Sequence, residues 1–215
     1  MSRERIGILA ALFALALSGC GNSSETYELL SGEYVERWGG AKIPEQGEVS
    51  VSEDGVLRMD VGRPLTGAVF REGDGFELPA SRYKVEFEAR RVEGGDFFAA
   101  LTFPVREKDS CATLVLGGWG GSLIGISCLD ERDASENFTM GSIPFENGRW
   151  YRFTVRVMDD EIKVWMNDSI IIDAPIAGKK ISLRPGDIEN CAPFGFASYM
   201  TEGEVRNLTL TRFGR

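Results

Sequence analysis

Histidine is absent from the 215 residues of this chain. The absence excludes Ser-His-Asp and Cys-His catalytic triads, HExxH zinc sites and any histidine general base. Chemistry in this protein would therefore depend on carboxylates, lysine, arginine, tyrosine or a calcium-type metal held by oxygen ligands.

Positive charge is also scarce, because 24 Lys and Arg residues stand against 33 Asp and Glu residues, a formal net charge of −9. Arg3 and Arg5 outweigh Glu4 by one charge within residues 1–19, so the rest of the chain stands at −10. An acidic surface argues against nucleic acids and anionic lipid headgroups as partners. After residue 19 there is also no apolar run long enough to span a membrane.

Cysteine is rare: Cys20, Cys111, Cys128 and Cys191 are the whole set. In an oxidising compartment the last three would allow one disulfide and one free thiol. Cys111 and Cys128 flank an expected hairpin with its turn near residues 119–122, which would bring them across from each other. The alternative is that all three are small buried hydrophobic residues.

The first twenty residues have the pattern of an export signal. Arg3 and Arg5 precede an apolar stretch, residues 6–17, that is too short to span a bilayer comfortably. The residues Leu-Ser-Gly-Cys at 17–20 resemble the lipobox of bacterial lipoproteins, a family in which the cysteine is lipidated and becomes the mature N-terminus. An ordinary secretory signal and an N-terminal membrane helix are the alternatives.

The lipobox resemblance implies a signal peptide over residues 1–19, a lipidated Cys20 with a short linker over residues 20–26, and one folded domain over residues 27–215. The lipid would be the only attachment to the membrane. Gly21 follows the cysteine in place of the aspartate that often retains such proteins at the inner membrane. This favours the outer membrane or the cell surface within a bacterial cell envelope.

Period-two alternation recurs down the chain, and no segment has a sustained helical period. In EVSVSEDGVLRMDV two alternating runs flank an Asp54-Gly55 turn, which predicts a hairpin. RYKVEFEAR and RWYRFTVRVM each place one apolar face opposite a charged face. Further strands are expected in FFAALTFPV, CATLVLGG, SLIGISCL, EIKVWMN, SIIID, FGFASY and VRNLTLTRF. About a dozen short strands separated by frequent turns predict an all-β sandwich or jelly roll.

The order of these strands is similar to that of a known family. FENGRWYRFTVRVMDDEIKVWMNDSIIID, KKISLRPGDIE and PFGFASYMTEGEVRNLTLTRF resemble the C-terminal half of concanavalin-like jelly rolls, and are closest to the bacterial 3-keto-disaccharide hydrolase domain family. The resemblance covers most of residues 27–213 and implies a concanavalin-like jelly-roll sandwich of two antiparallel sheets. The implied activity is cleavage of oxidised disaccharides or glucosides. Its motifs are strands and turns, and laminin-G-like modules and legume-type lectins share the architecture, so the fold does not fix the function.

Two tryptophans flanked by glycine are candidate ligand-binding residues. Trp119 in GGWGG has no neighbouring side chains, so its ring could stack on the apolar C–H side of a sugar. The alternative is a turn whose indole folds back on the core. Trp38 in ERWGG has the same flanks. Asp96 in EGGDFF enters a strand behind two glycines and is either a ligand-binding residue at the same rim or a turn aspartate.

The segment CLDERDASEN is rich in carboxylates, and three interpretations of it remain open. Asp130 and Asp133, with Glu136 and Asn137 nearby, offer oxygen ligands that a calcium ion would accept. Alternatively, Asp130, Asp133 and Glu136 are catalytic carboxylates, one acting as acid and another as base or nucleophile. Arg132 and Asn137 are candidate ligand-binding residues in this segment. In the third interpretation the segment is a solvated loop in which Arg132 neutralises a neighbouring charge.

Together these features predict a lipid-anchored envelope protein that engages carbohydrate through a jelly-roll domain, by binding rather than catalysis. One alternative is a hydrolase of 3-keto-disaccharides or related glycosides that uses carboxylates, with or without calcium. The other is a non-catalytic protein-interaction or scaffold module, which would show an exposed apolar patch and no polar pocket.

Overall fold

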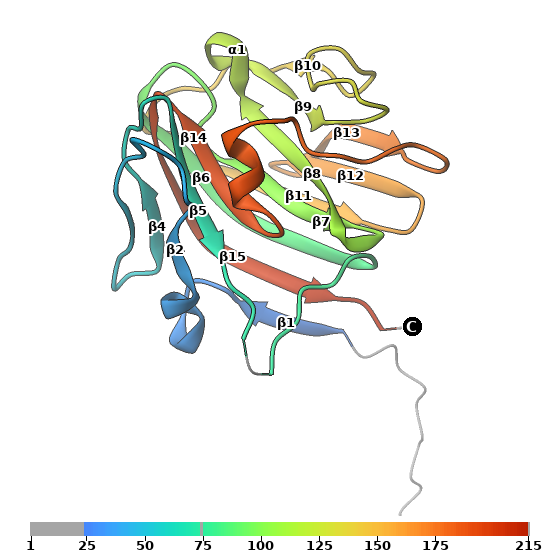
Figure 1. Ribbon diagram of the computed structural model, residues 1–215, viewed down its shortest axis with the longest axis horizontal. Coiled ribbons are helices and arrows are strands. Elements are labelled where there is room, and N and C mark those ends of the chain that lie inside the picture. Colours follow the sequence, from blue (N-terminus) through green and yellow to red (C-terminus); the bar gives the residue numbers. More distant parts are fainter. Residues whose placement is uncertain (1–23, 74, 215) are drawn as a thin grey trace, which may run out of the picture.

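Two antiparallel β-sheets packed face to face make up the computed structural model, which describes residues 24–73 and 75–214 (Figure 1). The predicted all-β jelly-roll sandwich of two antiparallel sheets is therefore confirmed. The predicted signal peptide, residues 1–19, and the predicted lipidation site, Cys20, lie outside the described residues. Among the residues that are described, no helix is both long and apolar enough to cross a membrane.

One sheet has eight strands. Seven of them run in the order β13-β12-β11-β6-β15-β4-β3, and β1 pairs with the C-terminal end of β15. β1 begins at Glu25, inside the segment expected to be a linker. The strands of this sheet are β1 (Glu25–Glu28), β3 (Val49–Val51), β4 (Val56–Met59), β6 (Tyr83–Gly94), β11 (Tyr151–Val157), β12 (Glu161–Met166), β13 (Ser169–Pro175) and β15 (Thr201–Arg212).

The other sheet has seven strands in the order β10-β9-β8-β7-β14-β5-β2. They are β2 (Trp38–Gly40), β5 (Leu65–Phe70), β7 (Ala100–Val105), β8 (Glu107–Gly117), β9 (Leu123–Ser127), β10 (Gly141–Ser142) and β14 (Gly195–Tyr199). Three short helical elements connect the strands: η1 (Gly32–Arg37), α1 (Gly118–Gly121) and η2 (Asp187–Cys191). η2 packs against β5 and β14, and it is the orange-red coil in front of the sheet in Figure 1.

The core lies between the sheets and follows the alternation seen in the sequence. In β6, Tyr83, Val85, Phe87 and Ala89 are buried, and the charged residues between them face outward. Ring contacts link the two sheets, because Phe87 of β6 lies 5.2 Å from Phe196 of β14, measured between ring centroids. Burial of this many aliphatic and aromatic side chains is the main source of stability for such a sandwich.

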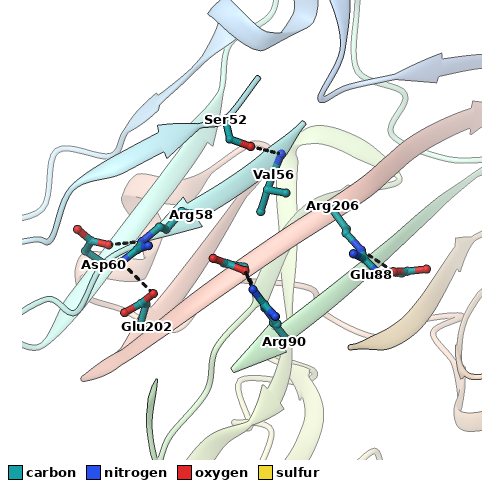
Figure 2. A network of polar contacts seen from close by, with 9 residues as sticks. Ser52, Val56, Arg58, Asp60, Glu88, Arg90, Glu202 and Arg206 are labelled. Carbon is teal, nitrogen blue, oxygen red and sulfur yellow. Dashed lines mark hydrogen bonds and ion pairs between the residues drawn. The ribbon is translucent and has the colours of Figure 1, made fainter. Parts of the chain in front are cut away.

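The outer face of the eight-stranded sheet carries cross-strand ion pairs. Figure 2 shows Arg58 of β4 reaching Glu202 of β15, and Arg206 of β15 reaching Glu88 of β6. Opposite charges on adjacent strands of one face stabilise the sheet modestly and keep that face polar.

The three described cysteines are buried and free. Of the two alternatives for the cysteines, the Cys111–Cys128 disulfide is not formed. The antiparallel register sets Thr113 opposite Ser127, so Cys111 and Cys128 are not directly across from each other. Burial raises the pKa of the Cys111 thiol to about 11 and that of the Cys191 thiol to about 12. The thiols therefore behave as small buried hydrophobic groups, as in the alternative interpretation.

Candidate functional site

A cleft of about 400 Å³ opens on the outer face of the seven-stranded sheet. Its floor includes Ala100, Thr113, Val115 and Ser127 of β7, β8 and β9. Thr113 and Val115 alternate along β8 with side chains that face the core, so they point outward into the cleft. The volume falls within the range typical of small-molecule sites.

Trp119 stands at the rim of this cleft, in the α1 turn that joins β8 to β9. The φ angles of Trp119 and Gly120 are 49° and 87°, a left-handed conformation that glycine accepts readily and that Trp119 adopts beside it. The Trp119 side chain is 47% exposed. The turn predicted near residues 119–122 is thus present, and its indole lies at the mouth of the cleft.

Asp96 lines the same cleft, from the loop between β6 and β7. One carboxylate oxygen accepts a hydrogen bond from the backbone N–H of Gly120 at 3.0 Å, and the other accepts one from the backbone N–H of Phe97 at 2.8 Å. Asp96 therefore ties its own loop to the α1 turn and helps to fix the position of Trp119.

Asp133 enters the cleft from the loop after β9, and its side chain is only 15% exposed. Its Oδ1 accepts hydrogen bonds from Ser127 Oγ at 3.1 Å and from the backbone N–H of Ala134. Its Oδ2 lies 2.6 Å from Nη1 of Arg184. The Arg184 guanidinium in turn lies over the Trp119 ring, 5.5 Å from the centroid. Asp133, Arg184 and Trp119 thus form a continuous chain of contacts at the cleft, which we call the rim triad.

Asp130 lies elsewhere on the same acidic loop. It is held by Nζ of Lys179 and the backbone N–H of Lys180, each at 3.0 Å. These bonds hold the pKa of the Asp130 carboxyl below its usual value, and the hydrogen bond from Lys180 lowers the pKa of Glu131 in the same way. Asp130 thus links the acidic loop to the loop of Lys179 and Lys180 at the surface, and it is not among the residues that line the cleft.

The expected calcium ligands do not come together. Asp130 is paired with Lys179, whereas Asp133 is paired with Arg184. Within residues 24–73 and 75–214, no three His, Cys, Asp or Glu side chains are grouped so that they could hold a metal ion. A calcium ion needs six to eight oxygen ligands, so this donor set does not fit one.

The other candidates in the acidic loop lie outside the cleft as well. Asn137 is a structural residue: its Nδ2 donates to the carbonyls of Ile126 and Asp133, and its Oδ1 accepts from the backbone N–H of Thr139. Glu136 and Arg132 are exposed and are not among the residues that line the cleft. Asn137 therefore braces the acidic loop and is not among the residues that line the cleft.

Trp38 is a core residue, which corrects its prediction as a sugar platform. Its side chain is 8% exposed, and its Nε1–H donates to the carbonyl of Leu29 at 2.8 Å. The ring packs 5.3 Å from Phe70, between centroids. The indole therefore stabilises the interior and has no face to offer to a ligand.

Several cleft residues were not anticipated from the sequence. Arg184 is the most important of these, because it joins Asp133 to Trp119. Phe97 and Tyr199 lie side by side in the cleft, 5.7 Å apart between ring centroids, and Asp187 lines it from η2. Tyr199 lies in the alternating segment FGFASY, and its outward position in that alternation could have identified it as a surface residue of the sheet. Nothing in the local sequence LRPGDI indicates that Arg184 would contact Trp119.

No family model matches the chain, and no curated protein matches it significantly. Solved structures do share its fold. The carbohydrate-binding module CBM66 from Bacillus subtilis matches with a TM-score of 0.50 at 14% identity, over 80% of this chain and 94% of that one. Domain 4 of AbnA, a GH43 extracellular arabinanase from Geobacillus stearothermophilus solved with arabinotriose, matches with a TM-score of 0.52 at 13% identity, over 88% and 91%.

A third similar structure is the apo form of the Crh5 transglycosylase, with a TM-score of 0.53 at 7% identity, over 90% of this chain and 84% of that one. At these identities the likeness is one of fold. The matches cover 94% of the CBM66 chain and 91% of the AbnA domain 4 chain, so the likeness extends over nearly the whole of each of these two structures.

Proposed function

We propose that this chain is a carbohydrate-binding domain whose ligand lies in the cleft beside Trp119. The observation that carries the proposal is the rim triad, an exposed indole next to polar groups that are already fixed in position. Sugar rings present an apolar C–H face and a rim of hydroxyls. An aromatic face with a few fixed hydrogen-bonding groups suits both parts of such a ligand.

The similar structures support this proposal. One is named as a carbohydrate-binding module, and another was solved with arabinotriose. The cleft of this chain lies on the outer face of one sheet of the shared sandwich and has an exposed tryptophan at its rim.

Replacing Trp119 by alanine tests the proposal. We expect Trp119→Ala to weaken binding of the recognised oligosaccharide at least tenfold, because truncating a central aromatic anchor commonly costs about 2 kcal/mol. The measurement is isothermal titration against a panel of neutral, amino and acidic oligosaccharides. Trp165→Ala is the matched control, since Trp165 belongs to β12 of the other sheet. Equal binding by wild type and Trp119→Ala would sink the proposal.

Hydrolysis of 3-keto-disaccharides or related glycosides is the second candidate function. It is favoured by one observation, namely that Asp96 and Asp133 line the same cleft. Glycosidases use two carboxyl groups that flank the scissile bond. Incubation with plain and 3-keto disaccharides, followed by detection of released monosaccharide, tests it directly. Release that is lost in both Asp96→Asn and Asp133→Asn would establish the hydrolase, and binding without release would leave the domain as a binding module.

We also propose that a lipid on Cys20 anchors the domain at the bacterial cell envelope, on the outer membrane or the cell surface. The support is the lipobox-like sequence at residues 17–20 and the position of β1, which lies at the end of the molecule opposite α1 (Figure 1). An anchor before β1 would leave the Trp119 turn pointing away from the membrane. Metabolic labelling with palmitate, present in wild type and absent in Cys20→Ala, tests the lipid, and protease treatment of intact cells tests exposure at the surface.

A further inference from the structure

The charged side chains that line the cleft are unequal in number: Asp96, Asp133 and Asp187 stand against Arg184 alone. Arg184 is paired with Asp133 at 2.6 Å, so its charge is balanced within the cleft. The Asp96 carboxylate is bonded to backbone N–H groups, which carry no net charge. Arg91 interacts electrostatically with Asp96 from behind the rim, but it is buried and does not line the cleft. The cleft therefore keeps an excess of negative charge, and the chain as a whole, at −9, adds a field of the same sign.

Arg184 is the cation that would otherwise recognise an acidic sugar, and the structure shows it already engaged. The two oxygens of Asp133 are both used, one by Arg184 and the other by Ser127 and a backbone N–H, so the carboxylate is firmly placed. Arg184 also lies over the ring of Trp119. A guanidinium has five N–H donors, so those not directed at Asp133 remain suited to neutral hydroxyl acceptors.

We infer that the cleft takes glycans that carry no carboxylate or sulfate, and that Asp133 sets this selection by holding Arg184. The inference rests on the proposed function and names its class of ligand. The carboxylate of an acidic sugar would be repelled by Asp96 and Asp187, and Arg184, the cation that would bind it, is already paired with Asp133. The hydroxyls of a neutral sugar can instead donate hydrogen bonds to these carboxylates, and the ammonium of an amino sugar is attracted to them. Asp133 is thus a specificity-determining residue.

Matched pairs of oligosaccharides test the inference. Each pair consists of a neutral hexasaccharide (cellohexaose, mannohexaose or galactohexaose) and the same oligosaccharide oxidised at C6 to the uronate, and a chitosan hexamer serves as the amino-sugar probe. For wild type we expect Trp119-dependent binding of a neutral or amino probe and at least tenfold weaker binding of the uronate partner. Asp133→Asn, which keeps the size of the side chain and frees Arg184, should narrow or reverse that ratio.

A second variant protects the test against a folding defect in Asp133→Asn. Asp187→Asn removes one carboxylate of the cleft without touching the Asp133–Arg184 pair. It should improve uronate binding several-fold while neutral binding changes less. Thermal unfolding of both variants checks that they are folded. Uronate binding by wild type that equals or exceeds neutral binding and is lost in Trp119→Ala would overturn the inference while supporting a glycan-binding function.

Fluorescence quenching decides the charge of the cleft without any sugar. Caesium and iodide quench tryptophan with opposite charges, and the contribution of Trp119 is the emission lost in Trp119→Phe. At low ionic strength we expect caesium to quench this contribution more strongly than iodide, relative to free tryptophan, and Asp133→Asn to shift the balance toward iodide. A preference for iodide in wild type would overturn the inference. If no oligosaccharide shows binding that depends on Trp119, the proposed function fails on that result alone. The quenching measurement then still tests whether the cleft carries negative charge.

Discussion

Arg91 is a buried arginine that holds the rim of the cleft together. Its side chain donates to Oδ1 of Asn147 at 2.6 Å and to the carbonyls of Phe145, Asp96 and Gly121, at 2.5, 3.3 and 3.4 Å respectively. The residue is only 6% exposed, and burial lowers the pKa of its guanidinium. Its partners belong to three separate loops, two of which carry Asp96 and Trp119. Arg91 is therefore a positioning residue for the cleft.

Replacing Arg91 by methionine should destabilise the fold by about 3 kcal/mol, because buried carbonyl acceptors lose their donors. We expect Arg91→Lys to lose less stability than Arg91→Met, because the lysine ammonium can still donate to some of these carbonyls, although to fewer than the guanidinium does. Urea unfolding measures the change. The control is Arg152→Met, an exposed arginine paired with the exposed Asp168, which should cost less than about 1 kcal/mol. Similar losses for Arg91→Met and Arg152→Met would contradict the bracing role.

The same residues explain why the site was only partly predictable from sequence. Trp119 and Trp38 have similar glycine flanks, yet one indole is 47% exposed and the other 8%. The difference is set by which face of its strand or turn each residue occupies, and a three-residue strand such as β2 has no alternation from which to tell. Asp130 and Asp133 likewise differ through partners, Lys179 and Arg184, that lie far along the chain.

Strands with one solvated face were readily predicted. β6, β11 and β12 alternate between buried and less buried residues, as their sequences suggest. β5 was missed for a physical reason: three consecutive residues, Thr66, Gly67 and Ala68, are all buried, because η2 packs on the side of β5 away from the core. A strand covered on both faces has no period-two pattern to read.

The α1 turn offers a test in two neighbouring glycines. Both have positive φ, 87° at Gly120 and 106° at Gly121. A Cβ on Gly120 would meet open space, whereas one on Gly121 would lie 2.9 Å from Nη1 of Arg91 and 3.0 Å from the carbonyl oxygen of Gly95. We expect Gly120→Ala to cost about 1 kcal/mol from backbone strain alone. Gly121→Ala should cost more and should also change the emission of Trp119.

Urea unfolding and tryptophan fluorescence of the two alanine variants provide the comparison. Because the substitutions are chemically identical and adjacent, any difference between them reports on the space around each glycine. Equal losses of stability, with unchanged Trp119 emission in Gly121→Ala, would show that the turn is not held by the contact between Arg91 and Gly121.

The two outer faces of the molecule use the same residue types for different ends. On the eight-stranded sheet, Arg90 and Arg206 both lie over the ring of Trp150, at 4.6 and 4.1 Å from its centroid. Each of these arginines also pairs with a glutamate, as Figure 2 shows for Arg206 and Glu88. On the seven-stranded sheet, a single guanidinium lies over Trp119, whose ring borders a cleft. The first arrangement is closed by its own contacts, and the second leaves room for a ligand.

The charge inventory of the chain also predicts how its stability depends on pH. With no histidine, no side chain of ordinary pKa titrates between about pH 5 and pH 8, so the free energy of unfolding should be nearly constant there. On the acid side, hydrogen bonds from the lysines lower the folded-state pKa of Asp130 and Glu131. Their contribution is present above the unfolded-state pKa and is lost as the pH falls through the folded-state pKa.

On the alkaline side the buried thiols act first, and the buried Tyr83, whose pKa burial also raises well above its usual value, acts at higher pH. A thiol of the unfolded chain ionises near pH 9, whereas burial raises the pKa of Cys111 to about 11 and that of Cys191 to about 12. The unfolded state therefore releases protons first, and stability falls as the pH rises above about 9, by up to ~1.4 kcal/mol per pH unit for each thiol. Urea unfolding between pH 8.5 and 10 measures this slope, which Cys111→Ala and Cys191→Ala should each reduce.

Lys180→Ala is the control for these variants. It removes the side chain that lowers the pKa of Glu131, so it should reduce the loss of stability at acidic pH and leave the alkaline slope unchanged. An alkaline slope that persists in the double cysteine variant would show that other groups control it.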